Sequence, residues 1–212
     1  MFEVKLVHDS IWEGYPRLST FVLTYPRIIH SELMTHRVFS RNAASSRAIP
    51  VEKLISGADF VPLFWGKNQK GMIAGSEEID CTDIWLEAME SAKAFAKIMS
   101  ERGLHKQICN RLLEPFSWIT VVVTATEWEN FFNLRVSGEA EPHFNKLASM
   151  IREVYYSYTP VPRTIHLPLG SDVRESVSNC AAVSYLKHES SPNLFDRLWR
   201  SGHLSPFEHQ AR

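Results

Sequence analysis

The chain has 212 residues, which is enough for one well-buried domain. Its hydrophobic content of 44% and charged content of 22% are typical of a soluble globular protein. The formal net charge of -1 argues against a general nucleic-acid binder, because such proteins use excess positive charge to displace counterions. Three cysteines without a C-x-x-C pair predict neither a disulfide framework nor a zinc site, and they favour a reducing cytosol.

The first predicted elements are two strands and a short helix. Alternating side chains predict strands near residues 2–7 and 18–25. Pro26 then opens a helix in which Ile29 and Leu33 share one face. The glycine-rich stretch that follows has no clear periodicity, so we expect residues 51–80 to be a mobile loop insertion.

A long helix and an ambiguous apolar segment come next. Apolar residues recur at helical spacing over residues 83–102, and a short helix over 104–113 is expected to end before Pro115. Residues 119–124 are rich in β-branched side chains. They form either a buried strand or the start of a buried helix, since so short a run has no decisive periodicity.

The remaining pattern is helical. Thr126 and Glu129 predict a capping box for a helix that runs to about Arg135. Further helices are expected at residues 142–158, near 173–187 and at 193–201. The whole pattern predicts an α+β fold: a single helix-rich domain over residues 1–212 with a small antiparallel or mixed sheet.

A polar run occupies residues 35–47 and reads Thr-His-Arg-Val-Phe-Ser-Arg-Asn-Ala-Ala-Ser-Ser-Arg. Its composition alone is compatible with a solvated surface loop. Such loops usually carry Lys, Glu, Gly and Pro, however, whereas Arg, His, Asn and Ser form directed hydrogen bonds. Three guanidinium groups at this density suit a phosphate or another polyanion. We therefore expect an anion site where the chain turns after the short helix.

The C-terminal segment His203-Leu-Ser-Pro-Phe-Glu-His209 is a second candidate. Ser205, Pro206 and Glu208 predict a capping box with proline at the first helical position. Capping accounts for neither of the two histidines. The spacing of His203, Glu208 and His209 does not match a standard helical metal site, so we expect no metal.

The polar run resembles the signature of the flavin-dependent thymidylate synthases, the ThyX family. The matching positions are His36, Arg37, Ser40, Asn42, Ser45 and Arg47. Thr35, Ala43 and Ala48 stand where the family has Arg, Glu and Tyr. Residues 203–209 are similar to a second element of that family, and residues 181–185 to a third. In the family the Ser-Pro-Phe-Glu-His element precedes the polar run, so the chain resembles a circularly permuted member, a rearrangement tolerated when the termini lie close.

Two intervening segments resemble the same family. Residues 106–115 are similar to the helix whose Arg, here Arg111, reaches the nucleotide. Residues 130–135 are similar to the segment that ends in the Arg, here Arg135, which binds and polarises the uracil. Arg135 also closes a very apolar stretch and would need a polar partner.

The resemblance implies an FAD-dependent methyltransferase that converts dUMP to dTMP, with methylenetetrahydrofolate as carbon donor and NADPH as reductant. The implied catalytic residues are Arg135 and Ser45. The implied FAD contacts are His36, Arg37, Asn42, Asn130, His203 and Ser205. The implied nucleotide ligands are Ser45, Arg47, Arg111 and Arg135. The resemblance also implies a homotetramer. The cysteine pattern and the lack of an apolar run of transmembrane length favour a cytoplasmic protein without a membrane partner, and the charge balance argues against a nucleic-acid partner.

Other functions stay open. Thr35 and Ala43 replace groups that normally face flavin or nucleotide, so a related flavin-dependent reaction on another deoxypyrimidine monophosphate is an alternative. A non-catalytic nucleotide-binding paralogue that keeps the phosphate arginines is another. The charge balance argues against a third, a nucleic-acid phosphate binder that uses Arg37, Arg41 and Arg47.

Overall fold

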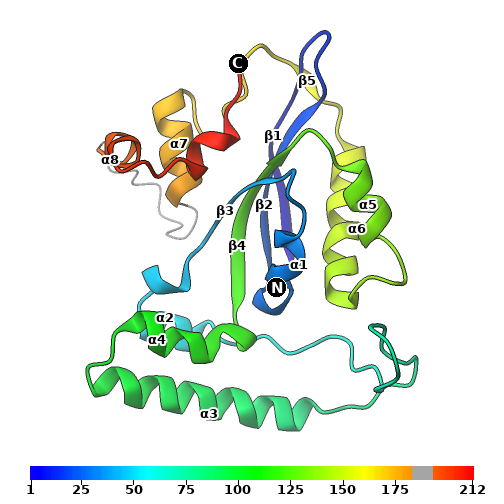
Figure 1. Cartoon of the computed structure of the whole chain (residues 1–212), viewed down its shortest axis with the longest axis vertical. Helices are drawn as coiled ribbons and strands as arrows, with labels where there is room; N and C mark the ends of the chain where they lie inside the picture. Colours follow the sequence, from blue (N-terminus) through cyan, green and yellow to red (C-terminus); the bar gives the residue numbers. More distant parts are fainter. Residues whose placement is uncertain (183–192) are drawn as a thin grey trace.

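The structure, a computed structural model, describes residues 1–182 and 193–212. Its centre is a five-stranded mixed sheet in the order β3-β4-β2-β1-β5 (Figure 1). The strands are β1 (Glu3–Ile11), β2 (Leu18–Pro26), β3 (Ser40–Ala43), β4 (Trp118–Ala125) and β5 (Val161–Pro162). β5 pairs in parallel with β1, and the other neighbours are antiparallel. The predicted α+β class and mixed sheet are confirmed.

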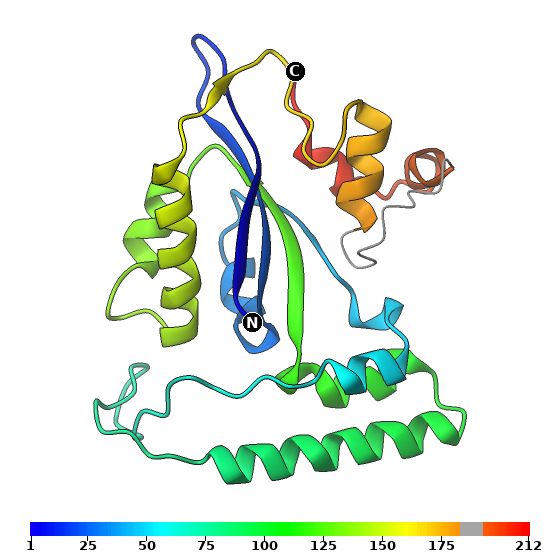
Figure 2. The same cartoon turned by 180° about the vertical axis from the view of Figure 1, so that it is seen from behind.

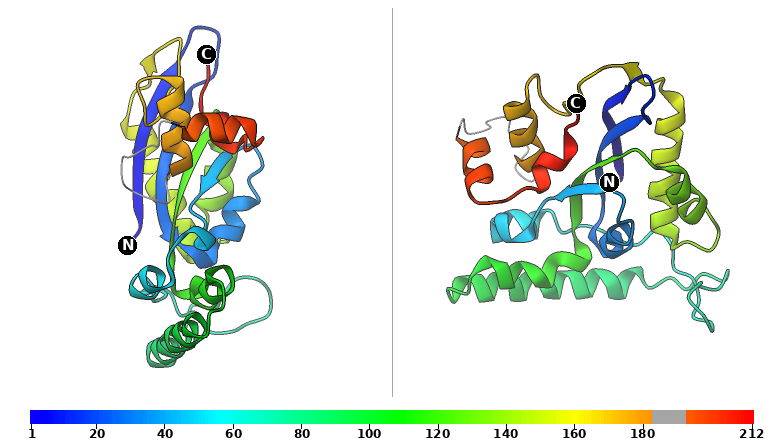
Figure 3. Two further views of the ribbon diagram at one scale, coloured as in Figure 1. Left: turned by 90° about the vertical axis from the view of Figure 1, so that its left-hand side faces the viewer. Right: turned by 45° about the horizontal axis from the view of Figure 1, so that its top comes forward.

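The helices lie on both faces and at one end of this sheet. They are α1 (His30–Met34), α2 (Val51–Ser56), α3 (Thr82–Glu101), α4 (Lys106–Cys109), α5 (Glu129–Arg135), α6 (Pro142–Ser157), α7 (Val173–Ala181) and α8 (Leu194–Arg200). The 3₁₀ helices used below are η1 (Arg27–Ile29), η2 (Ser46–Ala48), η3 (Asn110–Phe116) and η5 (Ser205–His209). α5 and α6 flank one side of the sheet, α7 and α8 flank the other, and α3 crosses its lower end (Figures 1, 2 and 3).

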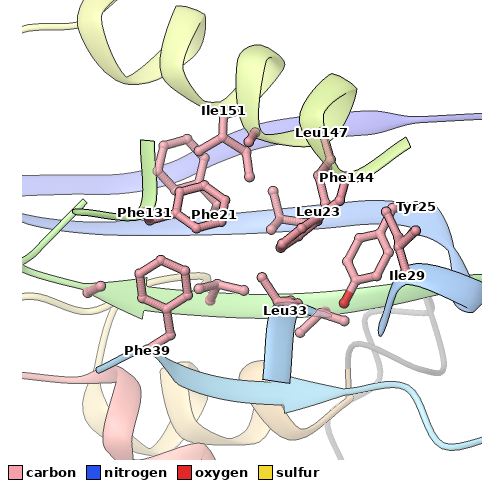
Figure 4. Packing of buried hydrophobic residues seen from close by; sticks show 14 of the residues in the cluster. Phe21, Leu23, Tyr25, Ile29, Leu33, Phe39, Phe131, Phe144, Leu147 and Ile151 are labelled. Atoms are coloured by element: carbon pink, nitrogen blue, oxygen red, sulfur yellow. The ribbon is translucent and has the colours of Figure 1, made fainter. Parts of the chain in front are cut away.

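The two faces of β2 and β4 differ because side chains alternate along a strand. Phe21, Leu23 and Tyr25 of β2 point toward α6 and form the main core, as Figure 4 shows. On the opposite face Thr20 and Thr24 flank an apolar position of the same strand. The segment over residues 119–124, left open between strand and helix, is the strand β4. It pairs with β2 along its whole length, with Thr124 opposite Thr20 and Thr120 opposite Thr24.

Several local expectations are wrong. Thr126 does not cap α5, because a carboxylate oxygen of Glu127 accepts the Asn130 backbone N–H instead. The helix expected to end before Pro115 continues through it as η3. The tighter 3₁₀ winding avoids the clash that an α-helix would impose between a proline ring and the carbonyl four residues earlier. α7 ends at Ala181, and the remainder of the helix expected to residue 187 falls on residues 183–192, outside the described part.

The stretch expected to be a loop insertion starts with a helix, α2, and is then mostly irregular. Phe60 within it is buried, and its carbonyl accepts the indole N–H of Trp85 on α3. The Leu63 N–H donates to His143 on α6, so the stretch connects α3 to the rest of the molecule.

The chain ends lie at opposite ends of the sheet, Met1 near α1 and Arg212 near β5 (Figures 1 and 2). Within residues 1–182 and 193–212, no helix has the length and apolarity needed to cross a membrane.

Candidate active site

The polar run follows the edge of the sheet, because residues 40–43 form β3, the outermost strand on that side. The run was expected to be a turn. It is a strand instead because β4 supplies pairing partners, with Ser40 opposite Thr124 and Asn42 opposite Val122. Alternation along β3 sends Arg41 and Asn42 to opposite faces of the sheet. Parts of the run can therefore reach elements on both sides.

On the α5 side, the run meets Arg135. The Nε of Arg135, the last residue of α5, donates to Nε2 of His36 at 2.9 Å, and one Nη donates to Oγ1 of Thr35 at 3.1 Å. The imidazole of His36 is 7% exposed and packs edge-on against Phe131. Burial, and then the charges of Arg135 and Arg41, lower the pKa of His36 to about 4. The ring is therefore neutral at pH 7, with Nε2 as acceptor and the proton on Nδ1.

Arg41 binds backbone carbonyls instead of an anion. Its Nη1 donates to the carbonyls of Leu33 and His36 at 3.1 and 3.2 Å. These carbonyls lie at the end of α1, where backbone acceptors lack partners within the helix. Of the three guanidinium groups expected to bind a polyanion, this one is engaged in closing the helix.

On the α7 side, the run meets the C-terminal element. Nδ2 of Asn42 donates to the carbonyl of Cys180 at 2.6 Å, and Oγ of Ser205 donates to Oδ1 of Asn42 at 3.3 Å. Ser205 makes no capping bond to its own helix, so the predicted capping box is wrong. Its hydroxyl joins two motifs that lie 163 residues apart in the sequence.

At the lower end of the sheet, the run meets η3 through Glu114. One carboxylate oxygen accepts the hydroxyl of Ser46 at 2.7 Å, and both accept Nη1 of Arg111 at 3.1 and 3.2 Å. Arg27 lies 3.4 Å from the same carboxylate. The buried amide of Asn110 donates to the carbonyls of Ser46 and Ile49, at 2.7 and 2.9 Å, and fixes the turn after β3.

The other expected site residues are more exposed. The exposed ones are Arg37, Arg47, Arg111, Asn130 and His203, while Ser45 is half-buried. In the sequence, Arg37 precedes β3 and Arg47 follows it. Asn130 is in the first turn of α5, five residues before Arg135. The polar run thus bonds directly to Arg135 and Ser205 and is linked to Arg111 through Glu114. Among the described residues, no hydrogen bond connects its side chains to those of Asn130 or His203.

Sequence reasoning missed three contributors: Thr35, Asn110 and Glu114. Thr35 was noted only as a departure from the family signature, yet it holds Arg135. Asn110 and Glu114 lie on either side of Arg111 within η3. An Asn that precedes an Arg in an apolar segment is the sequence signal that could have identified Asn110, which is buried and hydrogen-bonded. In residues 1–182 and 193–212, no cluster of three or more His, Cys, Asp or Glu side chains could hold a metal ion.

Comparison with known proteins gives the family and the fold. The family model described as "Thymidylate synthase complementing protein" matches residues 4–161, about three quarters of the chain. No curated protein sequence matches the chain.

Among solved structures, the UMP/dUMP methylase PolB from Streptomyces cacaoi bound with 5-Br UMP has a TM-score of 0.62 and 17% identity. The match covers 74% of this chain and 90% of that one. The same protein bound with 5-Br dUMP has a TM-score of 0.59 and 16% identity, with 74% and 91% coverage. At these identities the structural likeness concerns the fold. The family match over residues 4–161 shows that the chain belongs to the thymidylate synthase complementing proteins, the ThyX family of enzymes.

Proposed function

We propose that the protein is an FAD-dependent methyltransferase acting on a uracil nucleotide, with dUMP as the leading substrate and dTMP as product. Methylenetetrahydrofolate would supply the carbon and NADPH the reducing equivalents. The observation that carries the proposal is the position of Arg135, whose guanidinium group is bound by His36 of the family signature and by Thr35, which departs from that signature. This contact joins two segments with independent resemblance to one family.

Arg135 is suited to stabilise negative charge on a pyrimidine ring. Its Nε and one Nη are engaged, and these bonds hold the guanidinium plane in one orientation. Because His36 is neutral, it orients Arg135 without adding a second positive charge. A fixed cation next to the uracil would stabilise the anionic character that develops there during attack on the carbon donor.

Arg47 and Arg111 are suited to bind the nucleotide phosphate. Both are exposed, and Arg111 is held by Glu114, which also accepts the hydroxyl of Ser46. Ser45, half-buried at the start of the same turn, would add a hydroxyl contact to the substrate. The carboxylate of Glu114 sets the position of Arg111, and the guanidinium group has N–H donors to spare for an anion.

The residues near Asn42 fit a dinucleotide cofactor. Arg37 presents an exposed guanidinium group for a diphosphate, and Asn42 and Ser205 form a hydrogen-bonded pair on the α7 side of β3. His36 lies on the α5 side, where it binds Arg135. When bound, FAD would supply the hydride for the methylation. We further propose that His203 and Asn130 contact FAD from the neighbouring elements, with Arg37 binding its anionic part.

A flavin spectrum and a substrate assay test the proposal together. We expect the purified protein, supplied with FAD, to show bound-flavin absorption, and to release tritium from [5-³H]dUMP when methylenetetrahydrofolate and NADPH are present. Bound flavin with no tritium release and no methylated product from dUMP would overturn the dUMP reaction. A colourless protein that still binds dUMP would support the non-catalytic paralogue.

A second candidate substrate deserves the same assay. The solved structures with this fold include a UMP/dUMP methylase, and Thr35 and Ala43 replace the charged side chains of the family signature. Product formation from UMP or dCMP, but not from dUMP, would assign the chain to a related pyrimidine nucleotide reaction.

We also propose that the chain forms one domain and works as a cytoplasmic homotetramer. Arg37, Arg47 and Arg111 are exposed, as expected for a site that a neighbouring subunit completes. Light scattering would give the oligomeric state. Mixing Arg47→Ala subunits with Arg135→Ala subunits would restore activity if the two arginines of one site come from different chains.

A further inference from the structure

A chain of buried hydrogen bonds crosses the sheet on the face opposite the main core. Its members, in order, are Ser10, His166, Thr20, Thr124 and His209. The four successive hydrogen bonds measure 2.7, 2.8, 2.7 and 2.8 Å. None of these five residues is more than 5% exposed.

The sheet pairing places these residues in line. Thr20 of β2 lies directly opposite Thr124 of β4, and Ser10 lies on the neighbouring strand β1. His166 comes from the segment after β5, and its backbone pairs with Ala211. His209 is the last residue of η5, which also carries Ser205 of the candidate site.

The two ends of this hydrogen-bond chain have different surroundings. Ser10 and His166 line a cavity of about 350 Å³ beside the β1–β2 turn, together with Tyr15 and Arg163. At the other end, Nε2 of His209 is buried and has no hydrogen-bond partner within residues 1–182 and 193–212. The hydrogen-bond chain therefore runs from a cavity to the unpaired Nε2 of His209 in η5, the element that contacts Asn42 through Ser205.

Proton counting makes this chain directional. Each hydroxyl has one proton to donate, and a neutral imidazole has one donor and one acceptor nitrogen. Burial is the first cause that lowers the pKa values of His166 and His209, to about 3 and about 4, so both rings are neutral at pH 7. Thr20 and Thr124 are buried, and within residues 1–182 and 193–212 each hydroxyl has two partners, both in this hydrogen-bond chain. Because its single buried proton needs one of them as acceptor, each hydroxyl donates to one partner and accepts from the other.

Two arrangements satisfy these requirements. In the first, Ser10 donates to His166, every bond points toward His209, and both rings carry their proton on Nε2. In the second, every bond points toward Ser10, and both rings carry their proton on Nδ1. In each case His166 and His209 have the same tautomer, because the Thr20 and Thr124 hydroxyls between them must donate their protons in the same direction along the hydrogen-bond chain.

We propose that this hydrogen-bond chain sets, from the cavity, the tautomer of His209 in η5, the element that also carries Ser205 of the candidate site. A hydrogen-bond acceptor in the cavity that takes the Ser10 hydroxyl proton selects the second arrangement, in which Nε2 of His209 accepts. A donor to Ser10 selects the first, in which Nε2 of His209 donates. Whether Nε2 of His209 donates or accepts, within the element that also carries Ser205, is thus controlled from the far end of the hydrogen-bond chain.

Nitrogen NMR of the full chain labelled with ¹⁵N-histidine tests this directly, whatever reaction the protein catalyses. We expect the rings of His166 and His209 to show the same tautomer. Ser10→Ala should shift the ring signals of both in the same direction, although Ser10 does not contact His209. In a Thr124→Val background the same substitution should shift only the His166 signals.

Two variants separate this effect from general disturbance of the sheet. Thr124→Ser keeps the hydroxyl and should keep the linked response. Thr120→Val removes a hydroxyl from the same strand and face, where it pairs with Thr24 outside the chain, and should leave the linkage intact. Opposite tautomers in the unmodified protein, or a Ser10→Ala response limited to His166 when Thr124 is present, would overturn the proposal.

Discussion

Arg135 shows how a departure from a family signature can be compensated within the same structure. Thr35 stands where the ThyX signature has Arg, so a second guanidinium group is missing there. Its hydroxyl instead accepts from Arg135 and donates to the Glu32 carbonyl at 2.7 Å. Compared with the family signature, Thr35 removes one positive charge from the site. It also fixes the guanidinium group of Arg135, because a hydroxyl oxygen can accept its N–H and a second Arg could not.

Replacing Arg135 should therefore affect turnover much more than flavin binding. We expect Arg135→Ala to lower kcat by about 10²- to 10³-fold, the usual cost of losing a preorganised group that stabilises developing charge. Its Kd for FAD should stay close to that of the unmodified protein. Stopped-flow reduction kinetics and flavin titration would measure the two effects. An equal loss of both would show that Arg135 binds the cofactor.

Asn110 should be important for stability as well as for the site. Asn110→Ala removes both hydrogen bonds that fix the turn over residues 46–49. The Ser46 carbonyl keeps the backbone N–H of Ile49, whereas the Ile49 carbonyl loses its partner. We expect the free energy of unfolding to fall by on the order of 1 to 3 kcal/mol, the usual cost of one unsatisfied buried polar group. Urea denaturation would measure the change. Asn133→Ala, at an exposed position of α5, is the matched control and should have little effect.

At the scale of elements, α7 is held against the preceding loop by a close approach at Gly170. A Cβ at this position would lie 2.4 Å from the backbone N of Ser176 and 2.8 Å from its Cα. We expect Gly170→Ala to push α7 away and to destabilise the protein by about 1 to 3 kcal/mol, the usual cost of overpacking. Because the Cys180 carbonyl on α7 binds Asn42, the site should also be disturbed.

Gly138→Ala is the control for this prediction, because a Cβ there meets no atom within 4 Å. It should leave stability unchanged or raise it slightly through the reduced freedom of the unfolded chain. Thermal unfolding of the two variants would measure the difference. Equal melting temperatures would show that α7 adjusts to the added methyl group at no cost.

Elements with a strong local pattern were predicted, and those that depend on distant partners were not. The apolar stripes of α3 and α6 gave both helices to within a residue or two. β3 was missed, because Ser-Arg-Asn-Ala has little strand propensity and becomes a strand only by pairing with β4. The cap expected at Ser205 was wrong for a similar reason, since its hydroxyl bonds to Asn42 from a distant part of the chain.

The candidate site was predictable to a similar degree. The resemblance selected His36, Asn42, Ser205 and Arg135, which the structure connects in two separate pairs, His36 with Arg135 and Asn42 with Ser205. Neither spacing nor composition could show that Glu114 joins Arg111 to Ser46, because that contact depends on how η3 meets the end of β3. The roles of these residues in binding and catalysis stay predictions.

At the scale of the whole molecule, buried neutral histidines predict acid sensitivity. Burial is the main cause that lowers the pKa values of His30, His36 and His209 to about 4. In the unfolded chain these groups take up protons near pH 6.5, so the stability they contribute is present above that pH and is lost as the pH falls toward 4. We expect the free energy of unfolding to drop between pH 7 and pH 5, by up to about 1.4 kcal/mol per pH unit for each histidine. Urea denaturation across this range would measure it, and a constant value would contradict the prediction.

The order of the motifs along the chain also has a structural counterpart. Although the termini lie far apart, Ala211 and Arg212 line the same cavity as Tyr15, Pro16 and Leu18 at the start of β2. The Ser-Pro-Phe-Glu-His element thus approaches the strand that leads into the polar run. The circular permutation expected from the order of the motifs is consistent with this contact, and it stays a prediction.

The alternation of side chains along β3 has a consequence for insertions and deletions. Arg41 reaches the carbonyls at the end of α1, whereas Asn42 reaches α7 and η5 on the other face. Deleting one residue just before Ser40 would slide the strand by one position and exchange the two faces. Asn42 would then point toward the aromatic core and Arg41 toward Ser205. Point substitutions in this strand remove one contact at a time, but a change of length by one residue would disconnect the two sides of the molecule together.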